Sequence, residues 1–108
     1  MPYTVASYIH SDNISQGMGG CLAKIETQTD FCANTEEVQL FVMKIARMGY
    51  GHTSTFDEEH EDLGEGILRI GWQEMADKYE YLQKELNELK KEMKEEIKVT
   101  AIVCLCGV

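Results

Sequence analysis

Basic side chains and long apolar runs are both scarce in this chain of 108 residues. Lys and Arg number 10 against 19 Asp and Glu, which gives a formal net charge of -9. Because phosphates are bound by clustered Lys and Arg, this balance argues against direct contact with nucleic acid. No apolar run reaches the ~18 residues that a transmembrane helix needs, so we expect no membrane contact.

A secretion signal is also missing from the sequence. The opening Met1-Pro2-Tyr3-Thr4 lacks the basic region and apolar stretch of a signal peptide, so we expect a cytoplasmic protein. The length suits one small domain with one modest core, which we place over residues 1–108.

The four cysteines, Cys21, Cys32, Cys104 and Cys106, show no Cys-x-x-Cys spacing. In the cytoplasm we expect them to be reduced. Cys104 and Cys106 would point to one face of a predicted strand. A zinc or redox site would also need Cys21 and Cys32 to converge on them, whereas cysteine is often simply a small buried apolar residue. We expect no metal and no cofactor.

Residues of catalytic type are not arranged for catalysis. His10, His52 and His60 are widely separated, and the acids around His60 lack the ordered spacing of a calcium loop. Gly17-Met18-Gly19-Gly20 precedes a predicted strand, whereas a phosphate-binding loop precedes a helix. No Ser/His/Asp or Cys/His pattern has supporting spacing, so we expect no enzyme.

Three segments rich in β-forming residues are typical of strands: 3–10, 21–27 and 97–106. A helix is predicted over 36–48, because Glu36 and Glu37 suit a first turn and apolar residues then recur at helical spacing. We expect Gly49 to end it.

A second, longer helix is indicated from Ile67 to Glu96, which contains no proline. Its apolar residues repeat with 4-3-4-3 spacing, as in a heptad seam; they are Leu68, Trp72, Met75, Tyr79, Leu82, Leu86, Leu89 and Met93. The acids and lysines between them, Glu95 and Glu96 included, are typical of a solvated face with i,i+4 pairs.

Together these elements predict an α+β fold. We expect a three-stranded antiparallel sheet with a short helix and a long heptad-patterned helix packed on one face. At ~1.5 Å per residue the long helix would measure ~45 Å, more than so small a sheet can cover. The 66–96 segment should therefore protrude in part and bind a partner or a second copy, unless it bends or 49–66 folds back on it.

The turn between the second strand and the first helix carries Thr29-Asp30-Phe31, a large apolar ring beside a carboxylate. Such a tip suits insertion into another protein, since the ring supplies buried area and the carboxylate supplies direction. Phe31 filling the junction between sheet and helix is the alternative.

The run from Glu26 to Glu37, preceded by Tyr8-Ile9-His10, a Gly-rich turn and an apolar strand, resembles translation elongation factor Ts. That family has a Thr-Asp-Phe-Val-Ala-(Arg or Lys)-Asn-like run that enters a helix. The helix Phe41-Val42-Met43-Lys44-Ile45-Ala46 and the strand Val99-Thr100-Ala101-Ile102-Val103 are also similar to the family. Cys32 replaces the usual Val, and no basic residue precedes Asn34.

The resemblance implies a minimal relative with a single subdomain that binds the GTPase elongation factor Tu. Residues 29–34, Thr29, Asp30, Phe31, Cys32, Ala33 and Asn34, would form the contact. Phe31 would wedge between helices beside the nucleotide, and Asp30 would perturb the groups that hold magnesium. The family accelerates GDP release in this way, without covalent chemistry.

An alternative is an interaction protein that dimerises through the long helix and modulates or sequesters a partner without exchange activity. Its seam would comprise Trp72, Met75, Tyr79, Leu82, Leu86, Leu89 and Met93. The turn at 29–34 would then be a relic. Both interpretations hold if a dimer presents two turns.

Overall fold

The computed structural model describes residues 2–10, 19–55, 61–64 and 66–106, and these form an α+β fold. Its antiparallel sheet has five strands in the order β1-β2-β5-β4-β3. The strands are β1 (Tyr3–His10), β2 (Gly19–Thr27), β3 (Glu61–Gly64), β4 (Ile67–Arg69) and β5 (Ile97–Cys106). The predicted sheet of three strands is therefore wrong, although β1, β2 and β5 lie where those three strands were expected.

The two additional strands come from the segment before the predicted long helix and from its first residues. Gly64 and Gly66 both have positive φ, of 94° and 81°, and lie at the turn that joins β3 to β4. In β4, Leu68 pairs with Cys104 of β5, and the Ile70 N–H beyond it donates to the Ile102 carbonyl at 2.9 Å. Hydrogen bonding to the edge of β5 thus overrides the helical pattern of Ile67-Leu68.

Helix α2 (Glu36–Thr55) begins where the acidic pair predicts, but it continues through Gly49. A Cβ at residue 49 would lie 2.9 Å from Cys21 Sγ and 3.0 Å from Ile102 Cγ2. Glycine is therefore required there by the close approach of the helix to the sheet, and it does not end the helix. The apolar residues Val38, Phe41, Val42, Ile45 and Ala46 of α2 are buried in the core.

The prediction of one long helix from Ile67 to Glu96 is wrong, because two shorter helices occupy most of this segment. They are α3 (Trp72–Lys78) and α4 (Glu80–Met93), separated by Tyr79 with φ -123° and ψ 81°. The Trp72 indole N–H donates to Gln83 Oε1 at 3.2 Å across the resulting corner. No Gly or Pro marks this corner in the sequence, and the apolar stripe continues through it.

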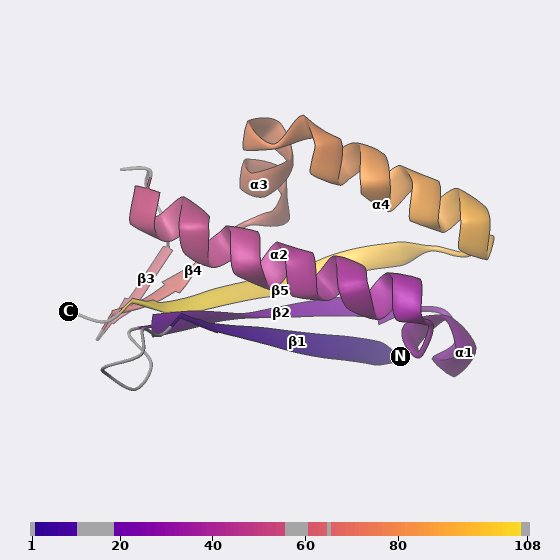
Figure 1. Ribbon diagram of the computed structural model, residues 1–108, viewed down its shortest axis with the longest axis horizontal. Coiled ribbons are helices and arrows are strands. Elements are labelled where there is room, and N and C mark those ends of the chain that lie inside the picture. Colours follow the sequence, from indigo (N-terminus) through magenta and orange to yellow (C-terminus); the bar gives the residue numbers. More distant parts are fainter. Residues whose placement is uncertain (1, 11–18, 56–60, 65, 107–108) are drawn as a thin grey trace.

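The corner resolves the conflict between the lengths of helix and sheet. Figure 1 shows α2, α3 and α4 on one side of the sheet, with α4 running back alongside α2. Met75, Leu82, Leu86 and Leu89 of the predicted seam are buried within the chain, and Trp72, Tyr79 and Met93 are partly buried. The heptad pattern therefore serves the core of this chain. None of the described helices is both long and apolar enough to cross a membrane.

The opposite face of the sheet is covered by no described helix (Figure 1). Strand alternation places Tyr3, Val5 and Ile9 of β1 on this open face, beside Leu22 of β2 and Leu105 of β5. All five are at least half exposed. An antiparallel sheet normally turns polar side chains to solvent, so this face is unusually apolar.

Candidate functional site

The Thr29-Asp30-Phe31 turn forms a one-turn helix, α1 (Asp30–Ala33), between β2 and α2. Thr29 is its N-cap, because the Thr29 hydroxyl accepts a hydrogen bond from the Cys32 N–H at 3.2 Å. This cap turns Phe31 away from the core, and its side chain is 81% exposed. The alternative that Phe31 fills the junction between sheet and helix is therefore wrong.

The structure brings the six predicted site residues together with a clear division of roles. Thr29, Asp30, Phe31 and Asn34 are exposed, whereas Cys32 and Ala33 are buried. The Asn34 N–H donates to the Asp30 carbonyl at 3.0 Å and ends the helix. The two buried residues attach the turn to the core, and the exposed ones face outward.

Hydroxyl groups from three segments hold the backbone of this turn. Thr27 Oγ1 donates to the Thr29 carbonyl at 2.9 Å, and Thr35 Oγ1 donates to the Cys32 carbonyl at 2.8 Å. Thr4 Oγ1 of β1 donates to the Ala33 carbonyl. The Thr29 and Cys32 carbonyls thus accept from a side-chain hydroxyl in addition to the backbone N–H groups of Ala33 and Thr35.

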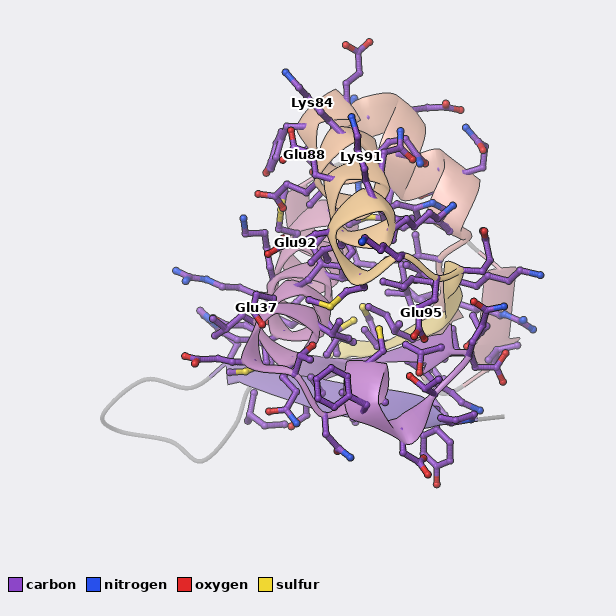
Figure 2. All side chains as sticks on the ribbon, turned by 90° about the vertical axis from the view of Figure 1, so that its right-hand side faces the viewer. Glu37, Lys84, Glu88, Lys91, Glu92 and Glu95 are labelled. Atoms are coloured by element: carbon purple, nitrogen blue, oxygen red, sulfur yellow. The ribbon has the colours of Figure 1, made fainter. Side chains whose placement is uncertain are left out.

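The turn is held most strongly by hydrogen bonds to Glu95, which follows α4 in the sequence and is labelled in Figure 2. Its Oε1 accepts hydrogen bonds from the Gln28 N–H at 2.9 Å and the Thr29 N–H at 3.1 Å. Its Oε2 accepts from the Thr29 hydroxyl at 2.9 Å. The Glu96 N–H in turn donates to Gln28 Oε1 at 2.9 Å. We call residues 28–34 with Glu95 the braced turn.

The pKa values of two groups reflect this arrangement. Partial desolvation raises the pKa of Glu95, but hydrogen bonds from Thr29, Gln28 and Cys32 outweigh it and leave this pKa below its ordinary value. Burial raises the pKa of the Cys32 thiol to about 11, assisted by the charge of Glu95 and by the hydrogen bond to it. Cys32 is therefore a thiol that donates, and Glu95 is a carboxylate that accepts.

Sequence reasoning missed Glu95 because it lies in a run of acids typical of a solvated helix face. The β2–β5 register pairs Thr27 with Ile97, so the residues just beyond these strand ends are brought together. Lys94, in the left-handed conformation with φ 57°, turns the chain out of α4 immediately before Glu95. Strand pairing is the signal that would have found Glu95.

The cysteines do not converge as a zinc site would require. Cys21 and Cys104 face each other across β2 and β5, whereas Cys32 lies beyond the other end of β2. The hydrogen bond with Cys21, together with burial, raises the pKa of the Cys104 thiol. The Cys106 side chain lies outside the described part. Among the described residues, no group of three or more His, Cys, Asp or Glu side chains is placed to hold a metal.

The histidines have separate environments. His52 is fully buried, with its Nε2 2.5 Å from Glu74 Oε2 and its Nδ1 3.5 Å from the Tyr79 hydroxyl. The sequence pattern did not predict that His52 would be buried in contact with Glu74 and Tyr79. His10 stacks on Tyr50 with ring centroids 5.2 Å apart. His60 and residues 17–18 of the glycine-rich run lie outside the described residues.

Comparison with known proteins found no matching family model, no matching curated protein and no matching solved structure.

Proposed function

We propose that this chain binds elongation factor Tu through the braced turn and promotes the release of its GDP. The observation that carries the proposal is the exposure of Phe31, 81% of whose side chain faces solvent on a backbone held by Glu95. The resemblance of residues 26–37 to elongation factor Ts supplies the identity of the partner. A cytoplasmic location, where translation occurs, belongs to the same proposal.

The bracing supports this function physically. A loop that is already ordered loses little conformational entropy when it inserts into a partner, so more of the contact energy appears as affinity. Large exposed aromatic rings are typical anchors at protein interfaces, because they bury much area in one pocket. Phe31 supplies such an anchor, and Asp30 places a carboxylate beside it.

Exchange by this route needs no covalent step. If the chain binds the nucleotide-free GTPase more tightly than the GDP-bound form, GDP affinity falls by the same coupling factor. A chain that binds both forms equally would only sequester or redirect elongation factor Tu. The distinction therefore rests on the difference between the two affinities.

The test is to mix the purified chain with elongation factor Tu that carries fluorescently labelled GDP and an excess of unlabelled GDP. We expect the rate of label release to rise with chain concentration and to saturate. A complex on a sizing column without faster release would indicate sequestration. The proposal would be refuted if the chain formed no complex with elongation factor Tu and did not accelerate GDP release.

Self-association is a second candidate, because the open sheet face leaves Val5, Ile9, Leu22 and Leu105 at least half exposed. Dimerisation through the predicted helix seam has less support, since Leu82, Leu86 and Leu89 are already buried within one chain. We propose that a second copy covers the open sheet face, which would present two braced turns from one dimer.

A further inference from the structure

A groove of about 290 Å³ lies between α2 and α4, separate from the open sheet face. Figure 1 shows these two helices side by side and running in opposite directions. Three apolar side chains line the groove, with Phe41 and Leu89 at its floor and Leu40 at its rim. Phe41 and Leu89 are nearly buried, at 5% and 9% exposure, whereas Leu40 at the rim is 55% exposed.

The rim of this groove is strongly acidic. Glu37 of α2 and Glu85, Glu88 and Glu92 of α4 line it, with Lys44 as the one cation among the lining residues. Figure 2 shows Glu88 and Glu92 on the flank of α4 that lies toward Glu37 of α2. Lys84 and Lys91 belong to the same helix but do not line the groove.

One carboxylate of the rim has an unused acceptor. Lys44 Nζ lies 2.7 Å from Glu85 Oε1, and so neutralises one of the four acids. Glu85 Oε2 is buried and accepts no hydrogen bond from any described residue. A buried oxygen without a donor is costly, but because solvent does not reach Oε2, a partner's donor would meet it only after the Glu85 side chain turned toward the groove.

We infer that this groove binds a basic amphipathic helix of a partner protein. A third helix packs naturally between two neighbouring helices, with its apolar side chains on the groove floor. Lys or Arg beside those side chains would meet the acidic rim, where Glu37, Glu88 and Glu92 line the groove. A second copy of this chain is disfavoured as the occupant, because its own acidic rim would meet this one.

The site extends beyond the proposed exchange function and does not depend on it. Residues 37–44 span seven steps of α2, or ~10 Å, which is about two turns of a bound helix. Such a contact would hold a basic partner segment beside the braced turn, since Glu37 lies three residues after Asn34. The chain would then possess two binding surfaces of different chemistry.

The probe is a fluorescein-labelled peptide of about 14 residues, long enough to form helix, with Leu at i, i+3 and i+7 and Lys or Arg beside them. We expect saturable binding by fluorescence anisotropy that weakens as salt rises from ~50 to ~300 mM. Two comparison peptides have the same length: one scrambles the leucine spacing, and the other carries Glu in place of each Lys and Arg.

Matched variants locate the site. E37Q/E88Q removes one rim acid from each helix and should weaken peptide binding about three- to tenfold. E36Q/E80Q removes one exposed acid from each helix outside the groove and should leave the Kd within about twofold. Leu40→Ala should weaken binding about tenfold, whereas Met43→Ala, equally exposed on α2, should not. Thermal melts confirm that each variant is folded.

The outcomes separate this inference from the exchange proposal, because Phe31→Ala should leave peptide binding unchanged. Equal Kd values for E37Q/E88Q and E36Q/E80Q would overturn the groove as the site. Equal binding of the acidic or the scrambled peptide would overturn the stated partner chemistry. Absence of saturable binding at low salt would overturn the inference altogether.

Discussion

Neighbouring residues of the braced turn have opposite surroundings. Phe31 is 81% exposed, whereas Cys32 is 1% exposed and donates to Glu95. The one-turn helix α1 is therefore anchored in the core by Cys32 and exposes the aromatic ring of Phe31 to solvent. Substitutions at the two positions should separate function from stability.

Phe31→Ala should abolish any acceleration of GDP release while changing the free energy of unfolding by less than ~0.5 kcal/mol. The reason is that an exposed side chain away from the core contributes little to stability. Release kinetics with elongation factor Tu and a urea titration measure the two effects. Met43→Ala, an exposed apolar control on α2, should change neither. Full exchange activity in Phe31→Ala would contradict the assigned role.

Glu95→Gln should lower the melting temperature at pH 7, because the amide cannot accept as many hydrogen bonds from the turn. The folded pKa of Glu95 is depressed, so its contribution is complete above the ordinary carboxyl pKa of ~4.3 and is lost as the pH falls through the folded value. The difference in melting temperature between the two proteins should therefore be constant from pH 7 to 5 and should shrink below about pH 4. A difference independent of pH would show that the charge of Glu95 is not what braces the turn.

At the scale of elements, the corner between α3 and α4 is held from outside these helices. Buried His52 of α2 lies 2.5 Å from Glu74 of α3 and 3.5 Å from the hydroxyl of Tyr79 at the corner. One side chain thus contacts both the helix before the corner and the residue at which the direction changes. The bend is a property of tertiary packing.

His52→Ala should destabilise the chain by about 2–4 kcal/mol, since it leaves a cavity and removes a partner from Glu74. Urea denaturation followed by circular dichroism measures this loss. His10→Ala is the matched control, because His10 is exposed on β1, and it should cost less than about 1 kcal/mol. Similar losses in both variants would contradict the role given to His52.

The elements differ in how far local sequence determines them. β1, β2, β5 and the start of α2 follow from alternation and from the acidic first turn, because these signals agree with the packing. Gly49 resembles a helix end, but it is needed because α2 approaches the sheet closely there. Ile67-Leu68 resemble a helix start, but they form strand β4 because they pair with the edge of β5. The corner at Tyr79 leaves the heptad pattern intact, so periodicity does not reveal it.

At the scale of the whole molecule, one sheet face is covered and the other is open. With strands of 8–10 residues, the open face offers roughly 600 Å² per copy, near the ~800 Å² per partner of a standard interface. Two such faces can stack as in a β-sandwich, with aligned strands. Self-association through this face would cover Ile9, Leu22 and Leu105 in both copies.

We expect sedimentation equilibrium to show a monomer–dimer equilibrium, which the double substitution Ile9→Lys and Leu22→Lys should shift at least about tenfold toward monomer. Both side chains are exposed, so the monomer should remain folded. Met43→Lys and Leu40→Lys on α2 form the control pair and should leave the equilibrium unchanged. A monomer at all concentrations, or a dimer that the control pair disrupts, would refute stacking through the open face.

The sequence by itself determined the α+β class, the strands at both ends of the chain, the start of α2 and the turn in which Thr29-Asp30-Phe31 lies. These depend on contacts between near neighbours: alternation along a strand, periodicity along a helix and acids in the first turn of a helix. Only the tertiary structure decided that the sheet has five strands, that the seam bends at Tyr79 and that Glu95 braces a turn 66 residues away. Each of these depends on pairing and packing between distant segments, which no local pattern records.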